Sequence, residues 1–146
     1  AVEEANKRFS KNCSFSRGVA SEDQIFKSFP FCNLIIINDV FCWISRESVL
    51  RSVANIDENL SEGGYLLIRD FFPDRKIRNQ NMHVSDAEIF CHKVLDSHAQ
   101  LFLQTGNYEL IGSKVFIDSD NTLSQTDEYD LFENRWIDCL LRKEWI

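Results

Sequence analysis

The sequence predicts an α/β fold in which two parallel strands are joined by a helix and followed by an antiparallel strand pair. The first observation is a strand, helix, strand pattern between Asn33 and Asp70. The second is a pair of loosely alternating segments, 108–117 and 132–141, which predicts the antiparallel strands. The third is composition, because 44% hydrophobic and 27% charged residues are typical of a globular domain. With 146 residues, we expect a single domain over 1–146.

The first strand of the pattern is the unbroken apolar run Leu34–Ile37, which ends in Asn38 and Asp39. Such a run is typical of a parallel strand covered on both faces, since a half-exposed strand would alternate. Ser45 is then predicted to cap a helix, because apolar residues recur at helical spacing from Val49 to Leu60.

Gly63 and Gly64 are predicted to end that helix, since glycine is common just beyond a helix C-terminus. A second apolar run, Tyr65–Ile68, follows and ends in Arg69 and Asp70. Two such strands separated by one helix form a βαβ unit.

The remaining segments are predicted more simply. A helix is expected over Ala1–Phe9 and another over 95–104, because apolar residues recur on one face of each. The polar segment 71–84 is expected to be irregular. The acidic stretch 118–133 has no lysine or arginine and is expected to be a solvated loop.

Charge and composition argue against several classes of protein. The formal net charge of −7 argues against nucleic-acid binding, which requires clustered lysine and arginine. No apolar stretch approaches the roughly 18 residues that a membrane helix needs. The five cysteines contain no C-x-x-C spacing, which disfavours a disulfide framework or a zinc knuckle. We therefore expect a cytoplasmic protein that binds neither membrane nor nucleic acid.

Two segments resemble the class I S-adenosylmethionine-dependent methyltransferases. Asn33–Ile44 resembles the fourth strand of that family and its following turn, and Leu60–Ile68 resembles its L-x-x-G-G-x-L-x-I turn into the fifth strand. Ala1–Phe9 resembles the helix after the second strand. The resemblance implies a Rossmann-like methyltransferase sheet that is incomplete at its N-terminal side, since the Gly-rich cofactor loop and the first two strands find no match here.

The resemblance also implies that the cofactor is S-adenosylmethionine. Val19 falls where the family often has an aspartate that binds adenine, so adenine recognition would depend on backbone groups of Ala20 and Ser21. Asn38 and Asp39 would contact the cofactor, because ligands of doubly wound sheets sit at the carboxyl ends of the strands. Alternatively, these two residues are only polar caps on a buried strand.

The predicted substrate-binding residues lie after the two strands of the βαβ unit. Phe41 and Trp43 match positions that wall the active site in the family, although Trp43 is also a natural packing residue. Asp70 ends the second strand and could reach the same cleft. His83 lies in the segment after that strand and is the favoured base among the three histidines. No catalytic residue is assigned, and no metal is expected, because the histidines lack further ligands at suitable spacing.

The sequence leaves two functions open. The first is methyl transfer from S-adenosylmethionine to a small or medium-sized acceptor molecule. The second is a non-catalytic, truncated methyltransferase-like domain that folds by self-association, as a homodimer formed across an exposed sheet edge. Another doubly wound fold, such as a response-regulator-like domain, fits the Gly-Gly turn and the terminal strand pair less well.

Overall fold

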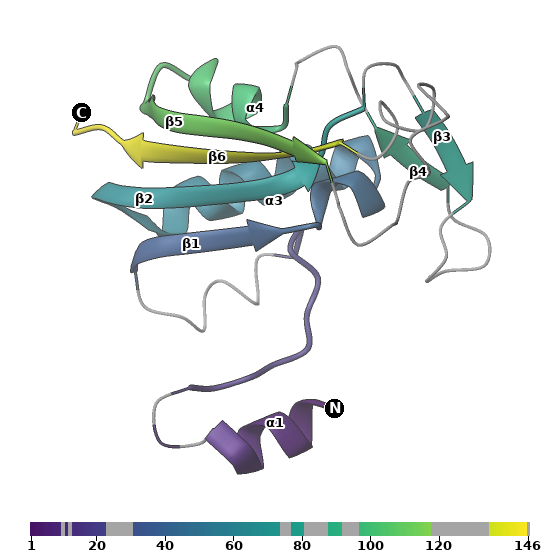
Figure 1. Cartoon of the computed structure of the whole chain (residues 1–146). Helices are drawn as coiled ribbons and strands as arrows, with labels where there is room; N and C mark the ends of the chain where they lie inside the picture. Colours follow the sequence, from purple (N-terminus) through teal and green to yellow (C-terminus); the bar gives the residue numbers. More distant parts are fainter. Residues whose placement is uncertain are drawn as a thin grey trace.

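A four-stranded mixed sheet forms the body of the computed structural model (Figure 1). The structure describes residues 1–9, 11, 13–22, 31–73, 77–80, 88–91, 97–117 and 135–145. The strand order is β1-β2-β6-β5, with β1 parallel to β2 and β6 antiparallel to both of its neighbours. The bounds are Cys32–Asn38 for β1, Leu60–Phe71 for β2, Tyr108–Ile117 for β5 and Arg135–Lys143 for β6. The predicted α/β class and the C-terminal antiparallel pair are confirmed.

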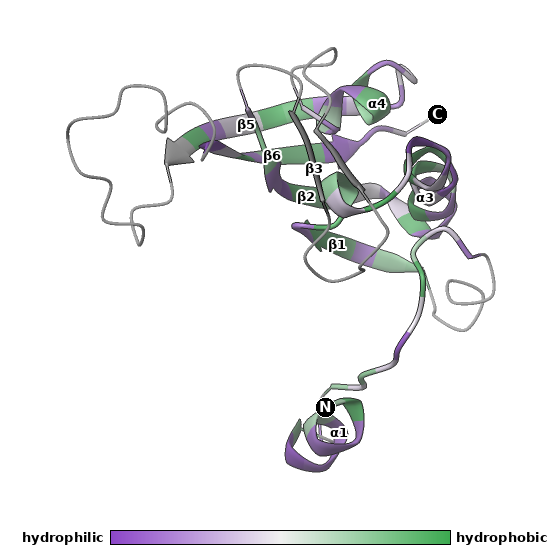
Figure 2. Ribbon diagram, turned by 90° about the vertical axis from the view of Figure 1, so that its right-hand side faces the viewer, coloured by the Kyte–Doolittle hydropathy of each residue, from purple (hydrophilic) through white to green (hydrophobic). Residues whose placement is uncertain are grey.

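The helices of the sheet domain pack on one face of the sheet (Figure 2). α3 (Arg46–Asn59) joins β1 to β2, and its N-cap is Ser45, whose side chain accepts a hydrogen bond from the Ser48 amide, as predicted. The short α4 (Ala99–Leu103) precedes β5 in sequence. It starts beside the η1 turn (Phe41–Trp43), where the ring of His98 meets that of Phe41. The core between these helices and the sheet is aliphatic and aromatic: Ile37, Phe41, Val49, Ile56, Leu60, Leu66, Ile68, Ala99, Phe102, Tyr108, Ile137, Cys139 and Leu141.

The prediction that Gly63 and Gly64 end α3 is wrong. The helix ends at Asn59, and both glycines lie inside β2, which is longer than the predicted run. A Cβ atom on Gly64 would lie 2.7 Å from the Ser61 carbonyl oxygen and 3.2 Å from that of Asn33. Gly64 is therefore required by a close backbone approach within the sheet, where the register between β1 and β2 is irregular.

The segment after β2 contains more structure than predicted. Two short strands, β3 (Ile77–Gln80) and β4 (Glu88–Cys91), pair antiparallel as a separate sheet. Figure 1 places this sheet beyond the carboxyl ends of β1 and β2, and β4 contacts the η1 turn. Strands of four residues are too short to show the alternation by which strands are found in a sequence.

The second face of the sheet carries exposed apolar side chains. Leu34 and Ile36 of β1 are 54% and 60% exposed, and Tyr65 of β2 is 41% exposed. The prediction that β1 is covered on both faces is therefore wrong for the described residues. Among them, α3 and α4 cover one face of the sheet, and the side chains of Leu34 and Ile36 lie on the opposite face. Among these residues β1 pairs only with β2, so its outer edge is open.

The N-terminal helix lies away from the sheet (Figure 1). α1 (Val2–Phe9) has the predicted bounds within a residue and buries none of its side chains. Within the described ranges, no helix is long and apolar enough to cross a membrane.

Candidate functional site at the carboxyl edge of the sheet

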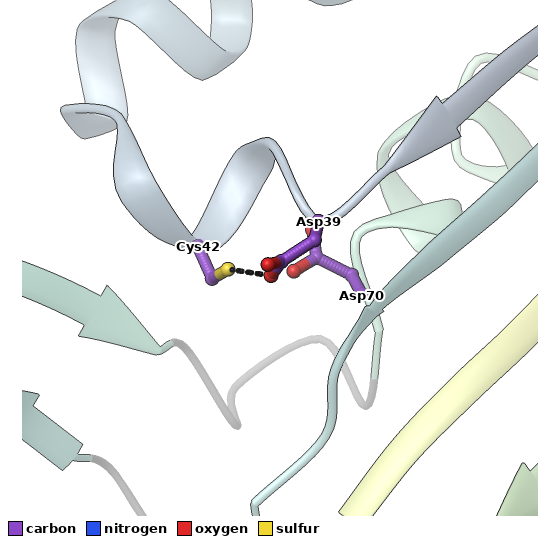
Figure 3. Close-up of side chains that lie close together, drawn as sticks. All are labelled: Asp39, Cys42 and Asp70. Atoms are coloured by element: carbon purple, nitrogen blue, oxygen red, sulfur yellow. Dashed lines mark hydrogen bonds between the residues drawn. The ribbon is translucent and has the colours of Figure 1, made fainter. Parts of the chain in front are cut away.

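Two acidic side chains and one thiol converge where β1 and β2 end (Figure 3). Asp39 directly follows β1, and its amide donates a hydrogen bond to the Arg69 carbonyl at 2.8 Å. The Asp39 backbone is left-handed, with φ of +55°. This conformation turns the chain into η1, where the Cys42 thiol donates a hydrogen bond of 3.1 Å to Asp39 Oδ1.

Asp70 contributes the second carboxylate from the end of β2. Its side chain is 1% exposed, and its Oδ1 accepts a hydrogen bond from the Phe71 amide at 2.8 Å. The Oδ2 atom has no hydrogen-bond partner among the described residues. His98 Nδ1 lies 3.0 Å from this oxygen, within ion-pair distance.

His98 directly precedes α4, and its side chain is 8% exposed. The ring meets Phe41 edge-on, with 5.3 Å between the ring centroids. Its Nε2 atom is buried and has no partner in the part of the chain that the structure describes. An imidazole held between a carboxylate and an aromatic ring has a fixed orientation, which a proton acceptor requires.

The cluster of Asp39, Cys42 and Asp70 is compact. One oxygen from each carboxylate and the Cys42 sulfur all lie within 4.8 Å of one another. Burial, followed by the charges and hydrogen bonds of Asp70 and Asp39, raises the pKa of the Cys42 thiol far above its ordinary range. The thiol is therefore neutral at physiological pH in the structure described here, and it acts as a hydrogen-bond donor.

The structure brings some of the predicted site residues together and separates others. Asp39 and Asp70 meet in the cluster described above. Asn38 is exposed. By strand alternation it lies with Ile36 on the face of the sheet opposite α3 and α4, called the open face below, so it points away from Asp70. Phe41 is fully buried and contacts the site through His98, whereas Trp43, in the same turn, is half-buried.

The other predicted residues lie elsewhere. Ala20 and Ser21 are half-buried, and the Ala20 carbonyl accepts a hydrogen bond from Asn55 of α3 at 3.2 Å. That carbonyl is already engaged, so an adenine contact there would use other backbone groups. His83 lies outside the described residues.

Cys42 and His98 are the site residues that sequence reasoning missed. Cys42 is a lone cysteine, and His98 is far from Asp70 in sequence, so neither carries a spacing signal. The position of Cys42 in the turn after a parallel strand was the one available indication.

Solved structures resemble this chain over nearly its whole length, whereas no protein-family model matches it and no curated protein shows significant similarity. N-methyltransferase NodS from Bradyrhizobium japonicum WM9, crystallised with S-adenosyl-L-homocysteine, is similar at 12% identity with a TM-score of 0.59. A methyltransferase from Methanosarcina mazei is similar at 10% identity with a TM-score of 0.62, and one from Leishmania major at 14% identity with a TM-score of 0.60. All three are described as methyltransferases, the latter two as dependent on S-adenosylmethionine.

This chain has the class I methyltransferase fold. The alignments include 98%, 100% and 96% of the chain, but 61%, 78% and 50% of the NodS, Methanosarcina and Leishmania proteins respectively. The chain therefore corresponds to part of the methyltransferase sheet, as predicted. At these identities the likeness establishes the fold and leaves the chemistry to be argued from the site.

Proposed function

We propose that this chain takes part in the transfer of a methyl group from S-adenosylmethionine to a small or medium-sized acceptor. The observation that supports it is the buried pair of Asp70 and His98 beside Asp39, at the carboxyl ends of two adjacent parallel strands. Ligands of doubly wound sheets bind at this edge. The similar NodS structure contains S-adenosyl-L-homocysteine, which is the product form of the proposed cofactor.

In this reaction the acceptor atom attacks the methyl carbon, the carbon–sulfur bond breaks, and S-adenosylhomocysteine leaves. The protein contributes mainly by holding donor and acceptor in line. An acceptor that carries a proton must also lose it. His98 is the proposed recipient, because Nδ1 faces the Asp70 carboxylate and leaves Nε2 without a partner among described groups.

We propose contacts with the cofactor or the acceptor for the other predicted residues. Asp39 and the backbone of Ala20 and Ser21 would contribute to the cofactor side. Trp43 would contact the acceptor, while Phe41 would act by holding the His98 ring. His83 remains a predicted contact to the acceptor, whereas the Asn38 side chain points away from Asp70.

Calorimetric titration with S-adenosylhomocysteine tests this proposal. We expect saturable binding near one cofactor per chain, weakened in Asp39→Asn. Asp138→Asn is the matched control, because Asp138 is a half-buried aspartate bonded to Arg69 on the open face. Absence of binding by a folded sample would exclude methyl transfer by this polypeptide alone.

A second function, self-association without catalysis, is supported by the apolar edge of the sheet. Leu34 and Ile36 are more than half exposed on β1, whose outer edge has no strand beside it in the described structure. Such an edge pairs readily with another chain. We infer that a second copy could cover it as a homodimer.

Light scattering coupled to gel filtration tests this alternative. We expect a dimer that Ile36→Lys converts to a monomer, because a buried lysine would oppose the contact. Leu50→Lys is the control, since Leu50 is 55% exposed on α3, away from the β1 edge. A wild-type chain that is monomeric at all concentrations would contradict self-association.

A further inference from the structure

We propose that Asp39, Cys42 and Asp70 form a binding site for a divalent transition-metal ion of the Zn²⁺ type, with a fourth position open to a small ligand. The inference concerns the donor atoms and does not depend on methyl transfer.

The donor geometry is close to what a zinc ion requires. The three donor atoms lie within 4.8 Å of one another, and Cys42 Sγ is 3.1 Å from Asp39 Oδ1. Around tetrahedral zinc, with bonds of about 2.0 to 2.3 Å, neighbouring donors lie about 3.3 to 3.8 Å apart. Side-chain adjustments of less than about 1 Å would therefore suffice. Figure 3 shows all three side chains directed toward the same point.

The charge of the cluster favours a cation. Two carboxylates share a largely buried space, and Asp70 is 1% exposed. The neighbouring Arg69 makes two hydrogen bonds of 2.7 Å to Asp138 on the open face. Burying carboxylates together is costly unless a cation accompanies them.

A second observation points to a ligand at the same place. Asp70 Oδ2 is buried and makes no hydrogen bond within the described ranges, although His98 Nδ1 lies 3.0 Å away. A buried carboxylate oxygen without a partner costs free energy, which coordination would recover. His98 then lies beside a metal ligand and acts as a positioning residue, since it restricts the orientation of the Asp70 carboxylate.

The mixture of donors selects the kind of metal. Two carboxylate oxygens alone would suit Mg²⁺ or Ca²⁺, whereas a sulfur donor favours a softer ion such as Zn²⁺. Binding replaces the proton of the Cys42 thiol with the metal ion, and the proton passes to solvent. Three protein ligands leave one position for water or another small ligand, as in catalytic zinc sites.

Titration with Co²⁺ tests the proposal, because a thiolate bound to Co²⁺ produces a strong charge-transfer band in the near ultraviolet. We expect the band to saturate at one Co²⁺ per chain and to be displaced by Zn²⁺. The background is Cys13→Ser, which removes an exposed thiol that could bind metal adventitiously.

Three variants test the site. Cys42→Ser should abolish the band, whereas Cys139→Ser should retain it, because Cys139 is equally buried but lies in β6 outside the cluster. Asp70→Asn should weaken Co²⁺ binding by about tenfold or more. Far-ultraviolet circular dichroism checks that each variant is folded. Absence of the band in the background protein, or its persistence in Cys42→Ser, would overturn the proposal.

Discussion

The backbone of Asp39 sets the geometry of the site that Asp39, Cys42 and Asp70 form at the carboxyl ends of β1 and β2. Its φ of +55° is uncommon for a residue with a side chain, and aspartate tolerates it better than most. The turn that results places the Asp39 carboxylate beside Cys42 and Asp70 rather than along the strand direction. A single residue conformation therefore brings together groups from two strands.

This conformation predicts a difference between two substitutions of Asp39. Asp39→Gly should be more stable than Asp39→Ala by about 1 kcal/mol, because glycine adopts positive φ without the steric cost that a Cβ imposes. Both variants lose the carboxylate, so the comparison isolates the backbone. Urea unfolding measures the difference, and equal stability of the two variants would contradict a left-handed Asp39.

Tyr108 gives a second prediction at the residue scale. Its hydroxyl donates a hydrogen bond of 2.7 Å to Asp57 Oδ1, and burial, followed by Asp57, raises the Tyr108 pKa. Because the folded state favours the protonated phenol, this contribution is complete below the unfolded pKa of about 10 and is lost as pH rises above it. Tyr108→Phe should lower stability by about 1 kcal/mol at neutral pH.

Unfolding of both proteins should be followed between neutral and alkaline pH. The wild type should lose more stability than Tyr108→Phe as pH rises above the unfolded tyrosine pKa. Parallel stability curves for the two proteins would show that Tyr108 titrates in the folded state as it does in the unfolded chain.

At the scale of elements, the longest strand depends on a backbone contact. Gly64 of β2 has no room for a side chain, because the Ser61 carbonyl of the same strand and, at a longer distance, the Asn33 carbonyl of β1 lie against it. The contact lies where the register between β1 and β2 is irregular.

Gly64→Ala should therefore destabilise the protein by about 1 to 3 kcal/mol, since the backbone must move to admit the methyl group. Gly112→Ala is the matched control, because no atom lies within 4 Å of a Cβ placed on Gly112 of β5. Thermal unfolding measures both. A loss in Gly112→Ala as large as that in Gly64→Ala would argue against the close approach.

At the scale of the whole molecule, the sheet is covered unevenly. α3 and α4 cover one face, whereas the other exposes Leu34 and Ile36, and α1 lies apart (Figures 1 and 2). Stability should therefore come from the core between the sheet and these two helices.

Removal of residues 1–9 provides the corresponding prediction. The change in free energy of unfolding should be below about 0.5 kcal/mol, because α1 buries no side chain. Urea unfolding of the shortened and full chains, each at several concentrations, measures this. A large loss would show that α1 packs against the sheet or against another copy.

The sequence predicted the elements with strong local signals. The apolar runs of β1 and β2, the Ser45 cap and the helical repeat of α3 are features of neighbouring residues, so periodicity and capping reveal them. The predicted roles of Gly63 and Gly64 failed because a glycine that ends a helix and one that permits close strands look alike in sequence. β3 and β4 were missed because each has only four residues, too few for a clear alternation.

The sequence by itself determined the class of fold and the edge of the sheet where a site would lie, because strand ends are marked by a local change from apolar to polar residues. Only the tertiary structure decided which side chains meet there. Asp39 and Asp70 were predicted separately, while Cys42 and His98 join them through the turn of η1 and the packing of α4. Contacts between residues distant in sequence depend on how the elements pack, and a single sequence carries no local signal for that packing.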